Sequence, residues 1–374
     1  MKENQKTKER LICSECGAVL TETEAHEHDG KILCPHCLDE LTAVCTCCGR
    51  RVWYSEAETD DNTVLCQSCY DYSYTRCEGC GRIISNDNAN YDDDDDEYPY
   101  CDTCYERMIN SAIRCYNYKP EPIFYGKDKL YYGVEVEVDK GGEYRDNAQI
   151  LLDTANSGNE TIYIKHDGSI NEGFEIVSYP MTLDYHENHM NWLEVFEKAI
   201  EMGYRSHNTS TCGLHIHVSR SAFGRNYADQ EVAIARIVYF VEHHWNELLK
   251  FSRRTEASMN HWASRYGISE NTQDTYKKAK DKHMGRYVAV NLENYSTVEF
   301  RIFRGSLRYK TFIAALQLVD TICRLAIGLS DKELENMSWS DFVLKIGSDK
   351  PELIEYLKEK RLYVNEIAEE GVEA

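Results

Sequence analysis

Four segments place acidic, imidazole and guanidinium side chains at alternate positions, the pattern that a β-strand presents on one face. Glu135 and Glu137 alternate with valines in YYGVEVEVD, and His215 and His217 alternate with aliphatic residues in CGLHIHVS. Side chains two positions apart on a strand lie on the same face, so each pair is presented together. The other segments are GFEIVS, with Glu175, and STVEFRIFRG, with Glu299, Arg301 and Arg304.

One polar strand face is ordinary in a half-exposed antiparallel sheet. Glutamate is depleted in strands, however, so four glutamates, two histidines and an arginine at equivalent places favour a common site. Converging carboxylates raise one another's pKa unless a divalent cation neutralises them. Carboxylate and imidazole ligands suit Mg²⁺ or Mn²⁺, and guanidinium groups such as Arg301 and Arg304 stabilise the charge that develops in phosphoryl transfer.

A second chemical signal is a cysteine repeat: thirteen of the 16 cysteines lie between Cys13 and Cys104. The first cysteine of each repeat advances by 32 residues, and glycine follows each first pair, where it suits a turn with positive φ. Four thiolates close one tetrahedral Zn²⁺ site, so we expect three structural zinc ions, although the spacing leaves sharing between repeats open. The predicted ligands are Cys13, Cys16, Cys34 and Cys37; Cys45, Cys48, Cys66 and Cys69; and Cys77, Cys80, Cys101 and Cys104.

These residues must be positioned by more than one domain, because 374 residues exceed what a single core usually organises. The predicted divisions are zinc modules at 10–42, 43–74 and 75–112, a linker at 113–129, a catalytic domain at 130–330 and a C-terminal helical extension at 331–374. Periodicity in the catalytic domain predicts strands over 131–139, 161–165, 173–178, 214–219, 287–293 and 297–304. It predicts helices over 186–202, 229–250 and 310–329.

The net charge and the distribution of apolar residues limit the partners and the compartment that the sequence predicts. A net charge of −22 disfavours a broad grip on nucleic acid, although a local basic patch would leave such binding open. The chain opens with MKENQKTKER and has no run of eighteen apolar residues, which predicts neither secretion nor membrane insertion. We therefore expect a cytoplasmic protein whose cysteines bind metal.

The ordered motifs GVEVE (133–137), DGSI with FEIVS (167–178), CGLHIHV (212–218) and VEFR (298–301) resemble the amidoligase family of the glutamine synthetase and glutamate–cysteine ligase superfamily. The resemblance, over residues 130–330, implies an α+β fold in which a curved antiparallel sheet binds ATP and divalent metals. A carboxylate would be phosphorylated to an acyl phosphate, which an amine then attacks. The cysteine repeats resemble zinc-ribbon and treble-clef modules, which could hold a partner or a protein target.

The same resemblance assigns residues. It implies that Glu135, His215 and Glu299 hold the metal that serves the γ-phosphate, and that Glu137 and Glu175 hold a second ion. It places Arg301 on phosphate, with Arg304 and Arg286 as further candidates. Asp167 either touches substrate or starts a turn. Arg253, Arg254 and Trp262 lie in a polar stretch that either covers the nucleotide or forms a plain surface loop.

Two other functions fit the sequence. The chain could be a non-catalytic zinc-finger binding or adaptor protein, which would turn over no nucleotide. It could also be a metal-dependent hydrolase or nuclease that activates water with the same carboxylates and would need no ATP. A nucleophilic Cys212 activated by His215 is not favoured, because an odd separation on a strand makes the two side chains diverge.

Overall fold

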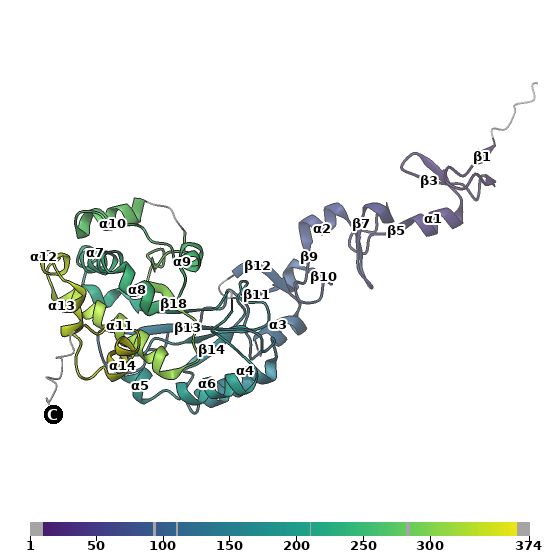
Figure 1. Cartoon of the computed structure of the whole chain (residues 1–374). Helices are drawn as coiled ribbons and strands as arrows, with labels where there is room; N and C mark the ends of the chain where they lie inside the picture. Colours follow the sequence, from purple (N-terminus) through teal and green to yellow (C-terminus); the bar gives the residue numbers. More distant parts are fainter. Residues whose placement is uncertain (1–9, 93–94, 110, 210, 282–284, 365–374) are drawn as a thin grey trace, which may run out of the picture. The chain divides into compact units, whose positions relative to one another are not determined.

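The computed structural model describes residues 10–92, 95–109, 111–209, 211–281 and 285–364 of the chain (Figure 1). The chain divides into two compact units, Met1–Asn110 and Ser111–Ala374. The first unit contains the cysteine repeats, and the second contains the predicted polar strands.

Within the described residues, the first unit repeats one motif three times: two short antiparallel hairpins followed by a helix. The first repeat consists of β1 (Leu11–Ile12), β2 (Val19–Leu20), β3 (His26–His28), β4 (Lys31–Leu33) and α1 (Pro35–Leu41). The second consists of β5 (Thr42–Val44), β6 (Arg51–Trp53), η1 (Tyr54–Glu56), β7 (Ala57–Thr59), β8 (Val64–Cys66) and α2 (Gln67–Ser73). The third consists of β9 (Tyr74–Arg76), β10 (Ile83–Ser85), η2 (Asn86–Asn88), β11 (Asn90–Asp92), β12 (Asp95–Tyr100) and α3 (Asp102–Ile109).

Successive repeats contact each other through the tip of the second hairpin. Asp29 accepts a hydrogen bond of 2.9 Å from the Trp53 indole, and the His28 ring lies 4.9 Å from the Trp53 ring. At the next junction Asp60 accepts a bond of 2.7 Å from the backbone N–H of Ile83. The repeats otherwise bury few apolar side chains, so they depend on the cysteine clusters for stability.

The second unit is built on an antiparallel sheet, which in the described part of the chain has six strands in the order β14-β15-β13-β16-β18-β17. The strands are β13 (Tyr132–Val138), β14 (Ile162–Lys165), β15 (Phe174–Ser178), β16 (Gly213–Ser219), β17 (Val290–Asn291) and β18 (Thr297–Arg304). Val134, Val136 and Val138 are fully buried on the core face. The register sets Glu135 opposite His215, Glu137 opposite Glu175 and His217 opposite Glu299, so the polar residues are cross-strand neighbours.

Helices cover the core face and surround the sheet. They are α4 (Arg145–Ala155), α5 (Leu183–Asn188), α6 (Trp192–Glu201), η3 (Arg220–Phe223), α7 (Tyr227–His243), α8 (Trp245–Ser252), α9 (Glu256–Trp262), α10 (Thr272–Asp281), α11 (Tyr309–Gly328), α12 (Asp331–Glu335), α13 (Trp339–Leu344) and α14 (Pro351–Glu359). Among the described residues, α11 alone has the length and apolar composition of a membrane span, but 78% of that stretch is buried inside the unit. It is the central core helix, packed against α7 and α14.

The mixed helix and antiparallel-sheet fold class is confirmed, whereas the curvature of the sheet and its likeness to glutamine synthetase stay predictions. The predicted helix over 186–202 is wrong, because the chain turns at 189–191 between α5 and α6. The helix predicted over 229–250 breaks at His244. Buried residues continue across both breaks, so periodicity does not detect them. The strand predicted over 287–293 is reduced to Val290–Asn291.

The segments on either side of the predicted catalytic domain both belong to the second unit. Residues 113–129, predicted to be a linker, lie against the sheet of the second unit: the Arg114 N–H donates to the Ile164 carbonyl at 2.8 Å. Helices α12 to α14 occupy the predicted C-terminal extension, whose residues 365–374 lie outside the described part of the chain.

Candidate active site

A pocket of about 280 Å³ opens on the polar face of the sheet. Strands β13, β15, β16 and β18 supply its floor, because each turns its charged residues away from the apolar core. All five predicted metal ligands line it, namely Glu135, Glu137, Glu175, His215 and Glu299, and so do Arg301 and Arg286. The structure therefore brings these residues together, while their roles as ligands stay predictions.

The glutamates and His215 form two adjacent clusters that share the imidazole. In the first, His215 Nδ1 lies 3.0 Å from Glu135 and 3.9 Å from Glu299. In the second, His215 Nε2 lies 3.7 Å from Glu137, and Glu175 completes the group. Each cluster offers three ligand atoms within 4.8 Å of one another, a spacing that fits one cation. A neutral imidazole has one lone-pair nitrogen, so His215 serves one of two ions.

The two clusters differ in counter-charge. Burial opposes ionisation of Glu135, but the neighbouring His217 and His215 rings hold the pKa of this carboxyl well below its ordinary value. Glu299 follows the same pattern: burial raises its pKa, the two imidazoles outweigh burial, and the carboxylate accepts bonds from Asn291 (2.8 Å) and Arg301. The first cluster is therefore held ionised.

The second cluster is short of positive charge. Burial, followed by the negative charge of Glu135, raises the pKa of Glu175 well above its ordinary value. Burial also raises the pKa of Glu137. Lys165, 3.3 Å from Glu175, is the cation paired with this cluster among the described residues. A divalent cation would relieve this repulsion, so the donor set fits Mg²⁺ or Mn²⁺.

The three predicted arginines lie in different surroundings. Arg301 pairs with Glu299 inside the pocket, and its Nε is buried without a hydrogen-bond partner among the described residues. Arg286 stands at the rim, where it donates to the Tyr116 hydroxyl at 2.7 Å. Arg304 does not line the pocket, and its guanidinium bonds to Asn208 at 2.7 Å.

A bulge in β18 explains the position of Arg304. Between the pairs Leu214–Phe303 and Ile216–Phe300, β18 has one residue more than β16. The bulge reverses the alternation, so Arg304 pairs with Gly213 on the polar face, one step beyond the pocket. Arg304 therefore does not line the pocket, and its catalytic role stays a prediction.

A family model described as "Putative amidoligase enzyme" matches residues 126–323, more than half of the chain. The chain belongs to this amidoligase family. The assignment indicates an amide-bond ligase at the level of the family, and the matched residues include every strand that lines the pocket.

Other comparisons add little to the amidoligase assignment. No curated protein matches the chain. A bifunctional glutathione synthetase from Pasteurella multocida is similar in structure with a TM-score of 0.36 and 11% identity, over 63% of this chain and 47% of that one. The chain thus spans less than half of that protein, and so slight a likeness supports no conclusion about activity.

Several pocket residues of the amidoligase were missed by sequence reasoning. They are Tyr116, Lys119, Lys165, Asn291 and Asn294. His217, which the sequence places on the polar face without a role of its own, also lines the pocket. Lys165 lies on a predicted strand, where the alternation of polar and apolar residues was the available signal. The others lie in irregular segments or on the shortened strand β17. Asp167 both caps a turn, accepting from the Ser169 N–H at 2.7 Å, and lines the pocket. Arg254 and Trp262 line it as well.

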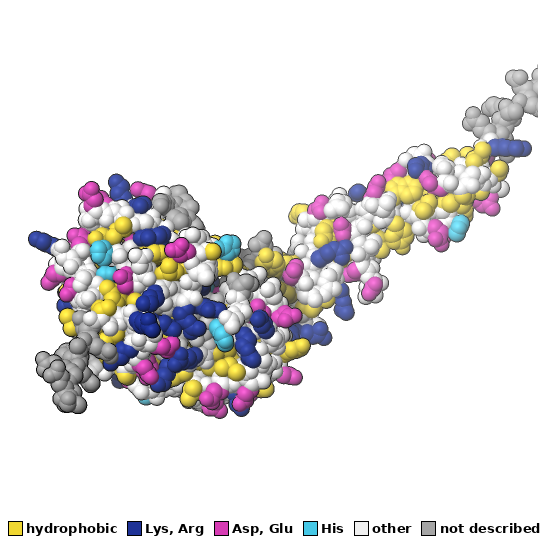
Figure 2. All heavy atoms as spheres, viewed as in Figure 1, with side chains coloured by type: hydrophobic (Ala, Val, Ile, Leu, Met, Phe, Trp, Pro, Cys, Tyr) yellow, Lys and Arg dark blue, Asp and Glu magenta, His cyan; other side chains and the backbone are white. Residues whose placement is uncertain are grey.

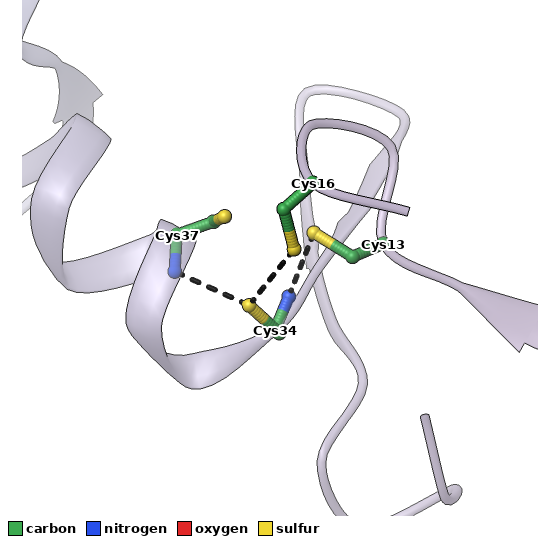
Figure 3. Close-up of side chains that lie close together, drawn as sticks. All are labelled: Cys13, Cys16, Cys34 and Cys37. Carbon is green, nitrogen blue, oxygen red and sulfur yellow. Dashed lines mark hydrogen bonds between the residues drawn. The ribbon is translucent and has the colours of Figure 1, made fainter. Parts of the chain in front are cut away.

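The amidoligase also has three clusters of four cysteines among its described residues, each made within one repeat. Figure 3 shows Cys13 and Cys16 from a turn facing Cys34 and Cys37 from the start of α1. Sulfur pairs lie 3.8, 3.9 and 3.9 Å apart in the three repeats. Tetrahedral Zn²⁺ with bonds of about 2.3 Å separates its sulfurs by roughly 3.8 Å, so the clusters fit zinc.

The local backbone favours metal binding in these repeats. Backbone N–H donors lower the pKa of Cys13 to about 6. At Cys45 and Cys77 burial opposes these donors, yet the pKa still falls to about 6 and about 7. The expected positive φ is confirmed at the glycine that follows each first pair: 74° at Gly17, 73° at Gly49 and 71° at Gly81.

Proposed function

We propose that the second unit is an ATP-dependent carboxylate–amine ligase that forms an amide or isopeptide bond through an acyl phosphate. The observation that carries the proposal is the pair of adjacent carboxylate and imidazole clusters beside Arg301 in one pocket, in a chain of the amidoligase family. We further propose that the zinc modules hold a partner or protein target and that the protein acts in the cytoplasm.

In the proposed reaction, a substrate carboxylate oxygen bonds to the γ-phosphorus of ATP and ADP departs. The amine then bonds to the acyl carbon, phosphate departs with the C–O bonding pair, and the amine nitrogen loses a proton. Mg²⁺ or Mn²⁺ held by the two clusters would neutralise phosphate oxygens. Arg301 supplies a fixed positive charge to the transferring group, and its free Nε leaves a donor for it.

Each cluster has a distinct part in this scheme. Glu135 and Glu299 stay ionised, so they keep ligand oxygens available beside the nucleotide. Glu137 and Glu175 lie toward β14 and β15, where the carboxylate substrate and the amine would meet. The amine must lose a proton, which a carboxylate of the pocket can accept.

The test is ADP release by the purified protein with ATP, Mg²⁺ and mixed amino acids or candidate proteins. Release that requires both a carboxylate and an amine supports ligation. Glu299→Gln should lower kcat/KM roughly a hundredfold or more, because it removes a ligand charge needed in the transition state. Zinc content should remain at three.

Glu293→Gln is the matched control, since Glu293 lines the same pocket but belongs to neither cluster. Its kcat/KM should stay within about threefold of the parent. Equal rates for Glu299→Gln and the parent would remove the clusters from the mechanism. Cleavage of a substrate without ATP would instead identify a hydrolase or nuclease, and no turnover at all would favour a binding protein.

A further inference from the structure

A basic patch lies beside the pocket, at the end of β18. Its residues are Lys140, Arg253, Arg304, Arg308 and Lys360. Figure 2 shows Lys and Arg side chains gathered on one face of the second unit. Such a concentration is unexpected in a chain with a net charge of −22, because a random distribution would surround most cations with carboxylates.

Direct contacts connect the members of the basic patch. Asn208 bridges two of them: its carbonyl accepts from Lys140 at 3.2 Å and its side-chain oxygen accepts from Arg304 at 2.7 Å. Arg304 and Arg253 line one small hollow together with Tyr356. The Lys360 ammonium lies 5.1 Å from the centre of the Tyr356 ring.

The patch is poorly neutralised. Glu359 pairs with Arg308 at 3.1 Å and with Lys360 at 2.9 Å. Lys140, Arg253 and Arg304 have no ion pair among the residues that the structure describes. Five positive groups therefore face solvent with one carboxylate between them, a local field that attracts anions.

A small hollow of about 10 Å³, the space of roughly one water molecule, lies inside the patch. It lies beside the start of α11, the 20-residue core helix, which supplies Thr311 and Ala315 to its lining. The Thr311 hydroxyl oxygen lines the hollow and is buried without a hydrogen-bond partner among the described residues. Arg253, Arg304 and Thr311 thus line one small hollow, and the charge of the two arginines is what it adds to the patch.

The patch is continuous with the active-site pocket. Arg254 lines the pocket and follows Arg253 in the chain, and its guanidinium donates to the Phe303 carbonyl at 3.0 Å, next to Arg304. A substrate that reaches from the clusters across Arg254 would therefore lie on the patch.

We propose that the basic patch binds an acidic peptide segment of the substrate, so that the ligase acts on a carboxylate carried by an Asp- or Glu-rich chain. This inference rests on the proposed ligase function, whose reaction consumes a carboxylate. A peptide is favoured over nucleic acid because a short acidic segment interacts mainly with the positive potential of the patch itself. Nucleic-acid binding depends on neutralising many phosphates, and the net charge of −22 of this chain opposes that.

The test measures binding by the full-length protein at low salt without ATP, so that it does not depend on turnover. The probes are a fluorescent octaglutamate, its octaglutamine counterpart and a single-stranded oligodeoxynucleotide with eight phosphates. Octaglutamate should bind at least roughly tenfold more tightly than octaglutamine, and affinity should fall as salt rises. The double variant Lys140→Glu with Arg308→Glu should lose roughly tenfold in octaglutamate affinity.

The matched control reverses the same charge elsewhere: Lys277→Glu with Lys332→Glu, two exposed lysines on α10 and α12. It should bind octaglutamate within about twofold of the parent. Equal losses in both double variants, or no preference for octaglutamate, would overturn the proposal. Tighter binding of the oligonucleotide would assign the patch to nucleic acid instead. Glu299→Gln should still bind octaglutamate, so loss of ligation and loss of peptide binding are separable.

Discussion

At the scale of single residues, the pocket is governed by how charge is shared between its two clusters. His215 presents one ring nitrogen to each, but only one can be a ligand in the neutral ring. Glu135 and Glu299 have imidazole and amide partners, whereas Glu175 relies on Lys165, and Glu137 accepts from the Gly213 backbone N–H. The second cluster should therefore be the more sensitive of the two to changes in nearby charge.

Lys165→Met should tighten binding of the second Mn²⁺ ion. The lysine ammonium competes with a cation for Glu175, and removing it relieves a repulsion of roughly 1 kcal/mol, about fivefold in affinity. Titration with Mn²⁺ followed by electron paramagnetic resonance would measure the change.

Lys119→Met controls for the general loss of one positive charge. Lys119 lines the same pocket, but it makes no ion pair among the described residues. Its replacement should change Mn²⁺ affinity by less than about twofold. Weaker Mn²⁺ binding in Lys165→Met than in the parent would show that the lysine organises the cluster instead of competing with the metal.

At the scale of elements, strand β16 holds the site together because it pairs with β13 on one side and with β18 on the other. Gly213 begins this strand and lies close to the pocket residues Arg254 and His215. A Cβ atom there would lie 2.8 Å from the Arg254 guanidinium and 2.9 Å from His215 Nε2. These distances are shorter than real Cβ contacts, so a side chain must displace one of the two groups.

Gly213→Ala should therefore impair activity more than stability. Displacement of His215 or Arg254 by a few tenths of an ångström should lower kcat/KM about a hundredfold, since positioning errors of this kind are costly. Gly133→Ala on β13 is the control, because its Cβ would meet neighbours at 3.7 and 3.8 Å, ordinary contact distances. Steady-state ADP release and thermal melting would compare the variants, and similar kcat/KM values for both would contradict the assignment.

The same elements show which features a sequence pattern can predict. Alternation of polar and apolar residues predicts β13, β15, β16 and β18, and its parity correctly places Glu135, Glu137 and His215 on one face. Parity fails at Arg304, because a single-residue bulge is invisible to a pattern of period two. Tyr116 lies in an irregular segment, where no period exists and position depends on tertiary contacts.

At the scale of the whole molecule, the two units are stabilised by different means. The second unit has one continuous apolar core around α11 and its sheet. The first unit has only small apolar clusters among its described residues, and cysteines are themselves major members of these clusters. Metal binding should therefore supply most of the folding free energy of the first unit and little of that of the second.

Removing zinc should unfold the first unit and leave the second intact. After treatment with a zinc-selective chelator, limited proteolysis should degrade residues before about 111 and leave a stable fragment with the mass of the second unit.

Two neighbouring cysteines test which thiols bind zinc. Cys48 belongs to a cluster and Cys47 does not, although both are exposed. Cys48→Ser should reduce the zinc content from three to two ions, whereas Cys47→Ser should keep three. Loss of zinc from Cys47→Ser, or parallel degradation of both units after chelation, would contradict this division of the chain.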